Sequence, residues 1–255
     1  MMKLRTNLQQ LNNDQKAPFS DDTIHNYGTY IRENNIYLQH KVDRHVEDIP
    51  IDKIVGIDQM YGDGTWGECL EGSWLKRLER NLTELSDKPN YYLTDTAKDG
   101  ISFIKIGDMY FIKQGKHRTI IARFLAHFNP DHFTNVSPLR NVEVTEYFID
   151  QEYLEMKAKI EEVAAQYPDL EFRLNHTTAT DDHSFLLVTG RNSVLSMESF
   201  TRDQFNHVIA GLTDPRLNEK WASDRTRPTS NIYAFISYSK CLKSLYQQAR
   251  EALGR

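Results

Sequence analysis

The segment from Ile101 to Phe128 constrains the fold more than any other part of this 255-residue chain. It opens with two β-favouring runs separated by Gly107 and Asp108, and a turn of this kind between apolar runs is a hairpin signal. From Thr119 onward the apolar residues recur with the period of a helix that packs one face on a sheet: Ile120, Ile121, Phe124, Leu125 and Phe128. The segment therefore predicts a β-hairpin over residues 101–114, a turn at Gly115 and a helix whose apolar face is buried.

The turn that joins the hairpin to the helix concentrates positive charge. Unpaired backbone N–H groups and the positive end of the helix dipole meet at a helix start and favour an anion there. Arg118 can hold two phosphate oxygens in a planar fork, Lys116 adds a point charge, and His117 titrates near neutrality. The predicted phosphate-binding residues are Gly115, Lys116, His117, Arg118 and Thr119. The alternative is a solvated turn in which Arg118 pairs with a carboxylate.

The order of elements around this turn resembles the ParB/sulfiredoxin-like superfamily, in which a strand ends in a Gly-x-His-Arg or Gly-x-Arg-Arg turn that opens a helix. Here the turn reads Gly115-Lys116-His117-Arg118, and it is flanked by an apolar strand at 49–54, a helical stretch at 74–82 and a closing strand at 142–148. The resemblance covers roughly residues 41–150. It implies an α+β fold with a mixed sheet and helices.

The resemblance also implies an activity. Nucleotide binding at the turn recurs across the branches of this superfamily, so the expected cofactors are ATP or another nucleotide and Mg²⁺, in an enzyme that transfers a phosphoryl group to a small-molecule acceptor or hydrolyses the nucleotide. In the free-serine kinases an acidic residue after the first strand acts as the base. Glu68 or Glu71 would be its counterpart here, and His117 is a further catalytic candidate. Asp58 and Asp63 are candidate Mg²⁺ ligands. Each of these acids could instead be a solvated loop carboxylate.

Two departures from the superfamily pattern narrow the function. Sulfiredoxins place their reactive cysteine where this chain has Lys116, and a lysine cannot supply a thiolate, so sulfinic acid reductase activity is disfavoured. The chromosome-partition branch has Arg at the position of His117, followed by a helix-turn-helix, whereas strand-like runs follow Asp150 here. Binding to a centromere is therefore also disfavoured.

A DNA-associated role is the alternative function. The chain could be a ParB-like regulator or nuclease of plasmid or phage type, and Lys76, Arg77 and Arg80 would then form its basic face. A net charge of −5 provides no global positive field for nucleic acid, which favours the nucleotide over DNA as the partner.

The composition is that of an ordinary globular protein, with 39% hydrophobic and 26% charged residues. No run approaches the length of a membrane span, and the first residues lack the apolar core of a secretory signal. We therefore expect a cytoplasmic protein without a membrane partner. Cys69 and Cys241 have no metal-ligand spacing, so a structural zinc is disfavoured.

Changes in sequence character predict three parts: an N-terminal helical extension (1–40), the ParB/sulfiredoxin-like domain (41–150) and a C-terminal α+β region (151–255) of unknown role. In the first part Ser20 resembles a helix cap. In the second part the Gly-rich stretch at 57–73 is predicted to be a loop. In the last part we expect a helix at 151–167, strands at 170–174 and 185–188, a helix after the capping box Thr201-x-x-Gln204, and a final helix near 232–253.

Overall fold

The computed structural model describes residues 3–59, 64–166, 170–176, 185–190 and 197–213. The chain divides into two compact units, Met1–Ile36 with Lys41–Ile149, and Tyr37–His40 with Asp150–Arg255. Helices and a mixed sheet occur together in the first unit, which confirms the α+β class. In the described ranges no helix is both long and apolar enough to cross a membrane.

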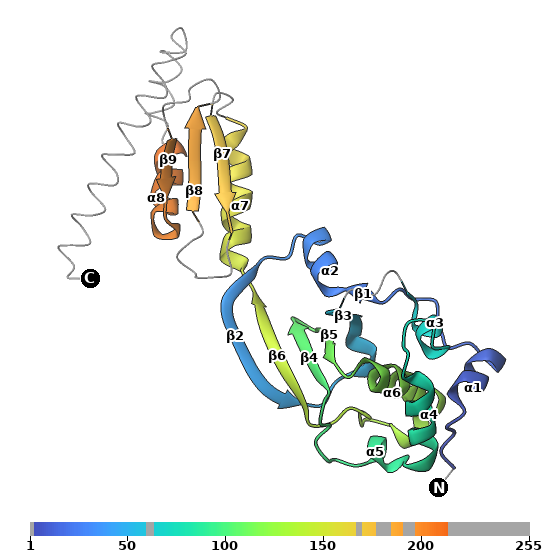
Figure 1. The fold of residues 1–255 in the computed structure, drawn as a ribbon. Coiled ribbons are helices and arrows are strands. Elements are labelled where there is room, and N and C mark those ends of the chain that lie inside the picture. Colours follow the sequence, from blue (N-terminus) through green and yellow to red (C-terminus); the bar gives the residue numbers. More distant parts are fainter. Residues whose placement is uncertain (1–2, 60–63, 167–169, 177–184, 191–196, 214–255) are drawn as a thin grey trace. The chain divides into compact units, whose positions relative to one another are not determined.

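The first unit is built on a six-stranded sheet with the strand order β1-β3-β5-β4-β6-β2 (Figure 1). The central hairpin of β4 and β5 is antiparallel, while the pairs β1–β3, β3–β5 and β4–β6 are parallel. The strands are β1 (His25–Asn26), β2 (Leu38–Glu47), β3 (Ile54–Ile57), β4 (Ser102–Ile106), β5 (Met109–Gln114) and β6 (Val142–Ile149). The predicted hairpin and closing strand are thereby confirmed.

The helix after the hairpin packs on this sheet as its periodicity predicted. It is α6 (Lys116–Phe128), and its Ile120, Ile121, Phe124 and Leu125 are at most 2% exposed. Full burial of such side chains stabilises the fold by about 1.5–3 kcal/mol each. The helix begins three residues before the expected Thr119, so the cationic residues belong to its first turn rather than to a loop before it.

Shorter helices complete the unit. They are α1 (Leu8–Asp14), α2 (Tyr27–Glu33), α3 (Trp66–Leu70), α4 (Leu78–Asp87) and α5 (Asn90–Leu93), with 3₁₀ turns at Ile51–Lys53 and Pro130–His132. On the opposite face of the sheet from α6, Phe111 of β5 contacts the rings of Tyr27 and Tyr30 in α2, with centroids 5.3 and 5.4 Å apart. Both faces of the hairpin are therefore buried.

Two local predictions for this unit are wrong, and one strand was missed. The run at 49–54 is not a strand, because Pro50 has no N–H and its carbonyl accepts from Lys53 in a 3₁₀ turn, so that β3 begins only at Ile54. No helix starts at Ser20, whose hydroxyl bonds Asn12 in the interior, and the edge strand β2 was not predicted from its mostly polar sequence.

The Gly-rich stretch at 57–73 contains a helix that was predicted to be a loop. Thr65 caps α3 by accepting from the backbone N–H of Glu68, and the Glu68 carboxylate accepts from the N–H of Thr65 in return. The sequence signal for this capping box, Thr-x-x-Glu, stands at residues 65–68. The glycines around it obscured the signal.

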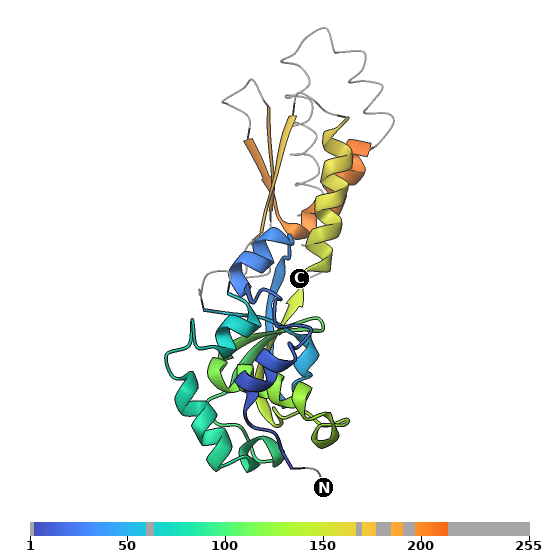
Figure 2. The same cartoon turned by 90° about the vertical axis from the view of Figure 1, so that its right-hand side faces the viewer.

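The second unit has the helix, strands and following helix that were predicted. They are α7 (Gln151–Ala164), β7 (Leu170–Asn175), β8 (Phe185–Gly190), an additional strand β9 (Met197–Phe200) and α8 (Arg202–Thr213). The strands form an antiparallel sheet in the order β7-β8-β9, and both helices lie on one face of it (Figure 2). One half of the predicted capping box is present, since the N–H of Thr201 donates to Oε1 of Gln204 at 3.1 Å, while the N–H of Gln204 donates to the backbone carbonyl of Thr201. The helix expected near 232–253 lies outside the described residues.

Candidate functional site

Gly115 fixes the backbone at the start of α6. Its φ of +88° lies in the left-handed region that favours glycine. A Cβ at this position would lie 2.7 Å from Cγ1 of Ile101 and 2.9 Å from the carbonyl oxygen of Gly100. Gly115 stands at the N-cap position and has no side chain that could accept from the first N–H groups of the helix. The backbone of the turn is therefore suited to an anion.

A cavity of about 310 Å³ opens at this helix start. Three elements contribute charged side chains to its lining: α4 with the residue before it, the end of β5, and the first turn of α6. The fixed cations are Arg77, Arg80, Lys113, Lys116 and Arg118, and His117 joins them. Glu84 is the carboxylate among the described residues of the lining. The cavity thus carries a strong excess of positive charge.

The α4 side of the cavity follows helical spacing. Residues three, four and seven apart share one helix face, which brings Arg77, Arg80 and Glu84 to the cavity together. Arg80 Nε lies 3.1 Å from the Glu84 carboxylate, so this pair neutralises itself in part. The backbone N–H of Arg77 donates to Nε2 of His117 at 3.4 Å, which joins the start of α4 to the start of α6.

Two described contacts hold Arg118 in place, and neither is with a carboxylate. Its NH1 donates to the backbone carbonyl of Asp99 at 3.0 Å, and its guanidinium carbon lies 5.0 Å from the centre of the Tyr91 ring. Both contacts orient the guanidinium, and a cation over an aromatic face is itself favourable. The partner in this hydrogen bond is a carbonyl rather than the carboxylate of the alternative interpretation.

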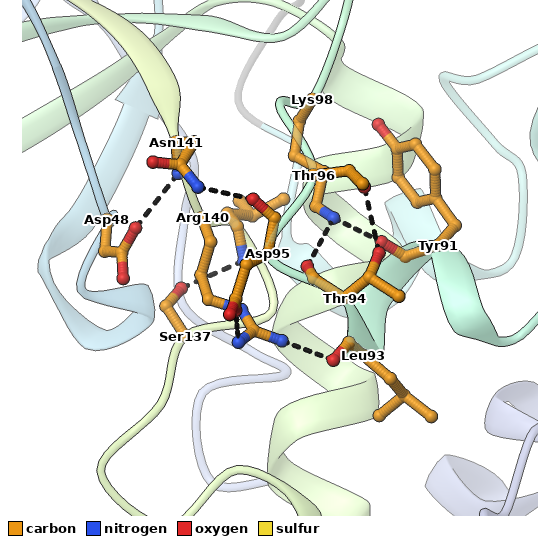
Figure 3. A network of polar contacts seen from close by, with 11 residues as sticks. Asp48, Tyr91, Leu93, Thr94, Asp95, Thr96, Lys98, Ser137, Arg140 and Asn141 are labelled. Carbon is orange, nitrogen blue, oxygen red and sulfur yellow. Dashed lines mark hydrogen bonds and ion pairs between the residues drawn. The ribbon is translucent and has the colours of Figure 1, made fainter.

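A polar network holds in place the segment that carries Tyr91, in α5, and Asp99, in the loop after it (Figure 3). Arg140 forms an ion pair with Asp95, and the ammonium of Lys98 donates to the carbonyl of Tyr91. Lys98 is only 2% exposed, and burial lowers its pKa. A buried lysine that donates to backbone carbonyls fixes the path of the loop, and with it the contacts that orient the guanidinium of α6.

His117 is the histidine in the described lining of the cavity. Burial lowers its pKa, and the neighbouring charges of Lys116 and Arg77 lower it further. Since Nε2 accepts a hydrogen bond, the neutral ring carries its proton on Nδ1. An anion in the cavity would offset the two cations and so favour the imidazolium.

This electrostatic coupling predicts a pH-dependent affinity for anions. A bound anion raises the pKa of His117 above its value in the empty cavity. Sulfate affinity, which involves no titration of the ligand in this range, should therefore rise as the pH falls from 8 through the pKa of the bound state, and level off below that of the empty state. Calorimetric titration between about pH 5 and 8 measures this. His117→Gln should flatten the dependence of sulfate affinity on pH. An unchanged dependence in that variant would show that the imidazole takes no part in anion binding.

The acids predicted for catalysis lie elsewhere. The Glu68 carboxylate accepts from the N–H of Thr65 at 2.8 Å and caps α3, and Glu71 is the exposed residue that ends α3. Neither lines the cavity, and the exposed Asp58 stands between two residues that do, Ile57 and Gln59, without lining it itself. Asp63 lies outside the described residues.

The structure brings four of the five predicted binding residues, 115–118, to the cavity wall. The fifth, Thr119, is fully buried, and its hydroxyl donates to the carbonyl of Gly115 at 3.2 Å, which supports the turn from behind. Sequence reasoning missed Glu84 and Lys113, and it assigned Arg77 and Arg80 only to a DNA-binding face. The spacing of Arg77, Arg80 and Glu84 indicates that they share one helix face. Nothing in the sequence near them indicates that this face shares a cavity with α6.

Comparison of the chain with protein-family models, curated proteins and solved structures finds no match. The geometry of the cavity and the chemistry of its lining therefore carry the function proposed below.

Proposed function

We propose that this protein is a nucleotide-dependent enzyme that holds the phosphates of ATP or a related nucleotide in the cavity at the start of α6. The observation that carries the proposal is the lining itself, in which five fixed cations gather at the first turn of a helix that begins at a left-handed glycine, two of them within that turn. Backbone N–H groups at a helix start together with Arg and Lys side chains are a common means of phosphate recognition. This is also the function that the resemblance to ParB/sulfiredoxin-like proteins led us to expect.

Charge and size support a polyphosphate as the ligand. Five cations against one carboxylate would repel a cation and would leave a neutral ligand unable to offset the charge, whereas a polyphosphate carries several negative charges. A cavity of about 310 Å³ is at the lower end of the range for small-molecule sites. It suits the phosphates, with the remainder of the nucleotide extending beyond it.

The chemistry of phosphoryl transfer or hydrolysis needs an acid near the phosphates. Glu84 is the carboxylate of the lining, and Asn81 adds an amide oxygen. Mg²⁺ prefers oxygen ligands and usually takes one or two carboxylates together with substrate phosphates, so this donor set fits an ion that enters with the nucleotide. In the proposed enzyme Glu84 holds Mg²⁺, and Arg118, Lys116 and the helix start position the phosphates for transfer to a small-molecule acceptor or to water.

Calorimetric titration of the full chain tests this proposal. ATP, ADP, CTP, GTP and inorganic tripolyphosphate are titrated with and without Mg²⁺, and phosphate release is measured for each nucleotide. Glu84→Gln should lose turnover and should bind ATP no more tightly with Mg²⁺ than without it, because the variant lacks the carboxylate that is proposed to hold the ion. Glu68→Gln serves as the comparison, since its carboxylate caps α3 outside the cavity. Loss of turnover only in Glu68→Gln would restore that residue as the catalytic acid.

Absence of binding to every nucleotide and to tripolyphosphate would refute the proposal. The DNA-associated alternative is tested in the same series with a duplex oligonucleotide, because the cations of the cavity could also contact DNA phosphates. Phosphate contacts weaken steeply with salt. Tight, sequence-selective duplex binding near physiological salt would favour the DNA-associated regulator or nuclease over the nucleotide-dependent enzyme.

A further inference from the structure

A second polar cluster lies in the first unit, where the edge strand β2 neighbours β6. Asp43 and His45 come from β2 and Glu146 from β6, and one potential ligand atom from each lies within 4.8 Å of the others. Residues two apart in a strand point to the same face, which explains how Asp43 and His45 come to share one site. None of the three lines the cavity at the start of α6.

We propose that Asp43, His45 and Glu146 form a binding site for a divalent first-row transition metal ion. Two carboxylates and one imidazole provide the oxygen and nitrogen donors that suit Zn²⁺, Fe²⁺ and Mn²⁺. Mg²⁺ and Ca²⁺ prefer oxygen ligands alone and gain little from the imidazole. Three protein ligands leave at least one coordination position for water or another ligand.

The imidazole gives an independent reason for a ligand at this place. Nδ1 of His45 is buried and has no hydrogen-bond partner among the described residues, although the Asp43 carboxylate lies 3.3 Å away. A buried polar atom without a partner costs free energy, which a metal ion between this nitrogen and the carboxylates would remove. Nε2 lies 3.4 Å from Glu47, and a carboxylate at the second ring nitrogen is the usual means of orienting a metal-binding histidine.

The local charge favours a cation as well. Asp43, Glu47 and Glu146 bring three carboxylates together, and Lys105 is the cation that contacts two of them, at 3.4 Å from Glu47 and 3.6 Å from Glu146. One ammonium does not balance three carboxylates. Since Lys105 also competes with a metal ion for Glu146, its removal should tighten metal binding.

Calorimetric titration of the metal-free full chain with Zn²⁺, Mn²⁺ and Mg²⁺ tests the site. We expect one equivalent of Zn²⁺ to bind with an affinity that falls at least about tenfold in His45→Gln and in Asp43→Asn. Zn²⁺ should bind more tightly than Mn²⁺, and Mg²⁺ most weakly. The matched control is His40→Gln, an exposed histidine at an odd spacing from His45 on the same strand, which should bind like the parent.

Lys105→Gln should change the Zn²⁺ affinity in the opposite direction and bind the ion several-fold more tightly than the parent. A variant with a disrupted fold would not show such a gain. Should His45→Gln fail to fold, Asp43→Asn still decides, since that side chain is 59% exposed. Failure of the parent to bind Zn²⁺, an unchanged affinity in both ligand variants, or an equal loss in His40→Gln would each overturn the proposal. The test does not depend on nucleotide binding.

Discussion

Gly115→Ala should lower the free energy of unfolding by about 2–5 kcal/mol, because it combines two costs. A left-handed backbone costs a residue with a Cβ about 1–2 kcal/mol, and overpacking adds about 1–3 kcal/mol. The Cβ would contact Ile101 at 2.7 Å and, more seriously, the carbonyl oxygen of Gly100 at 2.9 Å, and a backbone atom cannot rotate away. Chemical denaturation of the purified variant measures the loss.

Gly72→Ala is the matched control for the backbone cost. Gly72 has a φ of +87°, close to that of Gly115, but a Cβ there would find no atom within 4 Å. It should therefore lose only about 1–2 kcal/mol. Equal losses at both positions would mean that the loop at Gly100 moves away at no cost, and that the contact between this loop and the start of α6 does not shape the cavity.

Arg118→Ala should weaken nucleotide binding by about ten- to a hundredfold, since a hydrogen bond to a charged group contributes roughly 1.5–3 kcal/mol. Arg118→Lys keeps the charge and loses the planar fork, so it should lie between the parent and the alanine variant. Calorimetry with ATP and with tripolyphosphate separates the phosphate contact from any contact to the rest of the nucleotide, because both ligands should lose affinity alike.

Two controls make this result interpretable. Arg32→Ala removes an exposed arginine from α2, outside the lining of the cavity, and should bind like the parent. Denaturation of Arg118→Ala should show a small loss of stability, because the bond to the Asp99 carbonyl and the contact with Tyr91 disappear with the guanidinium. An alanine variant that binds nucleotide as tightly as the parent would make the turn purely structural.

The hairpin and the helix after it were predictable because their signals are local. Alternation and a Gly-Asp turn indicate the two strands, and a helical period predicts the buried face of α6. Prediction failed where a local signal was weak or obscured, as in the polar edge strand β2 and in α3, whose capping box is surrounded by glycines. At Ser20 a clear local signal gave a wrong prediction. Serine is a favourable helix cap, but here its hydroxyl forms a buried hydrogen bond with Asn12 instead.

The sequence by itself determined the cationic turn at the start of α6, because turn chemistry and helix periodicity act over a few residues. Only the tertiary structure decided what shares the cavity with it. His117 accepts a hydrogen bond from Arg77, 40 positions away, and the carbonyl that orients Arg118 belongs to Asp99, 19 positions away. The same holds for His45 and Glu146, which adjoin only because β2 and β6 are neighbours in the sheet. Such pairings depend on how whole elements pack, and the free energy of packing is shared among many distant side chains that no local pattern records.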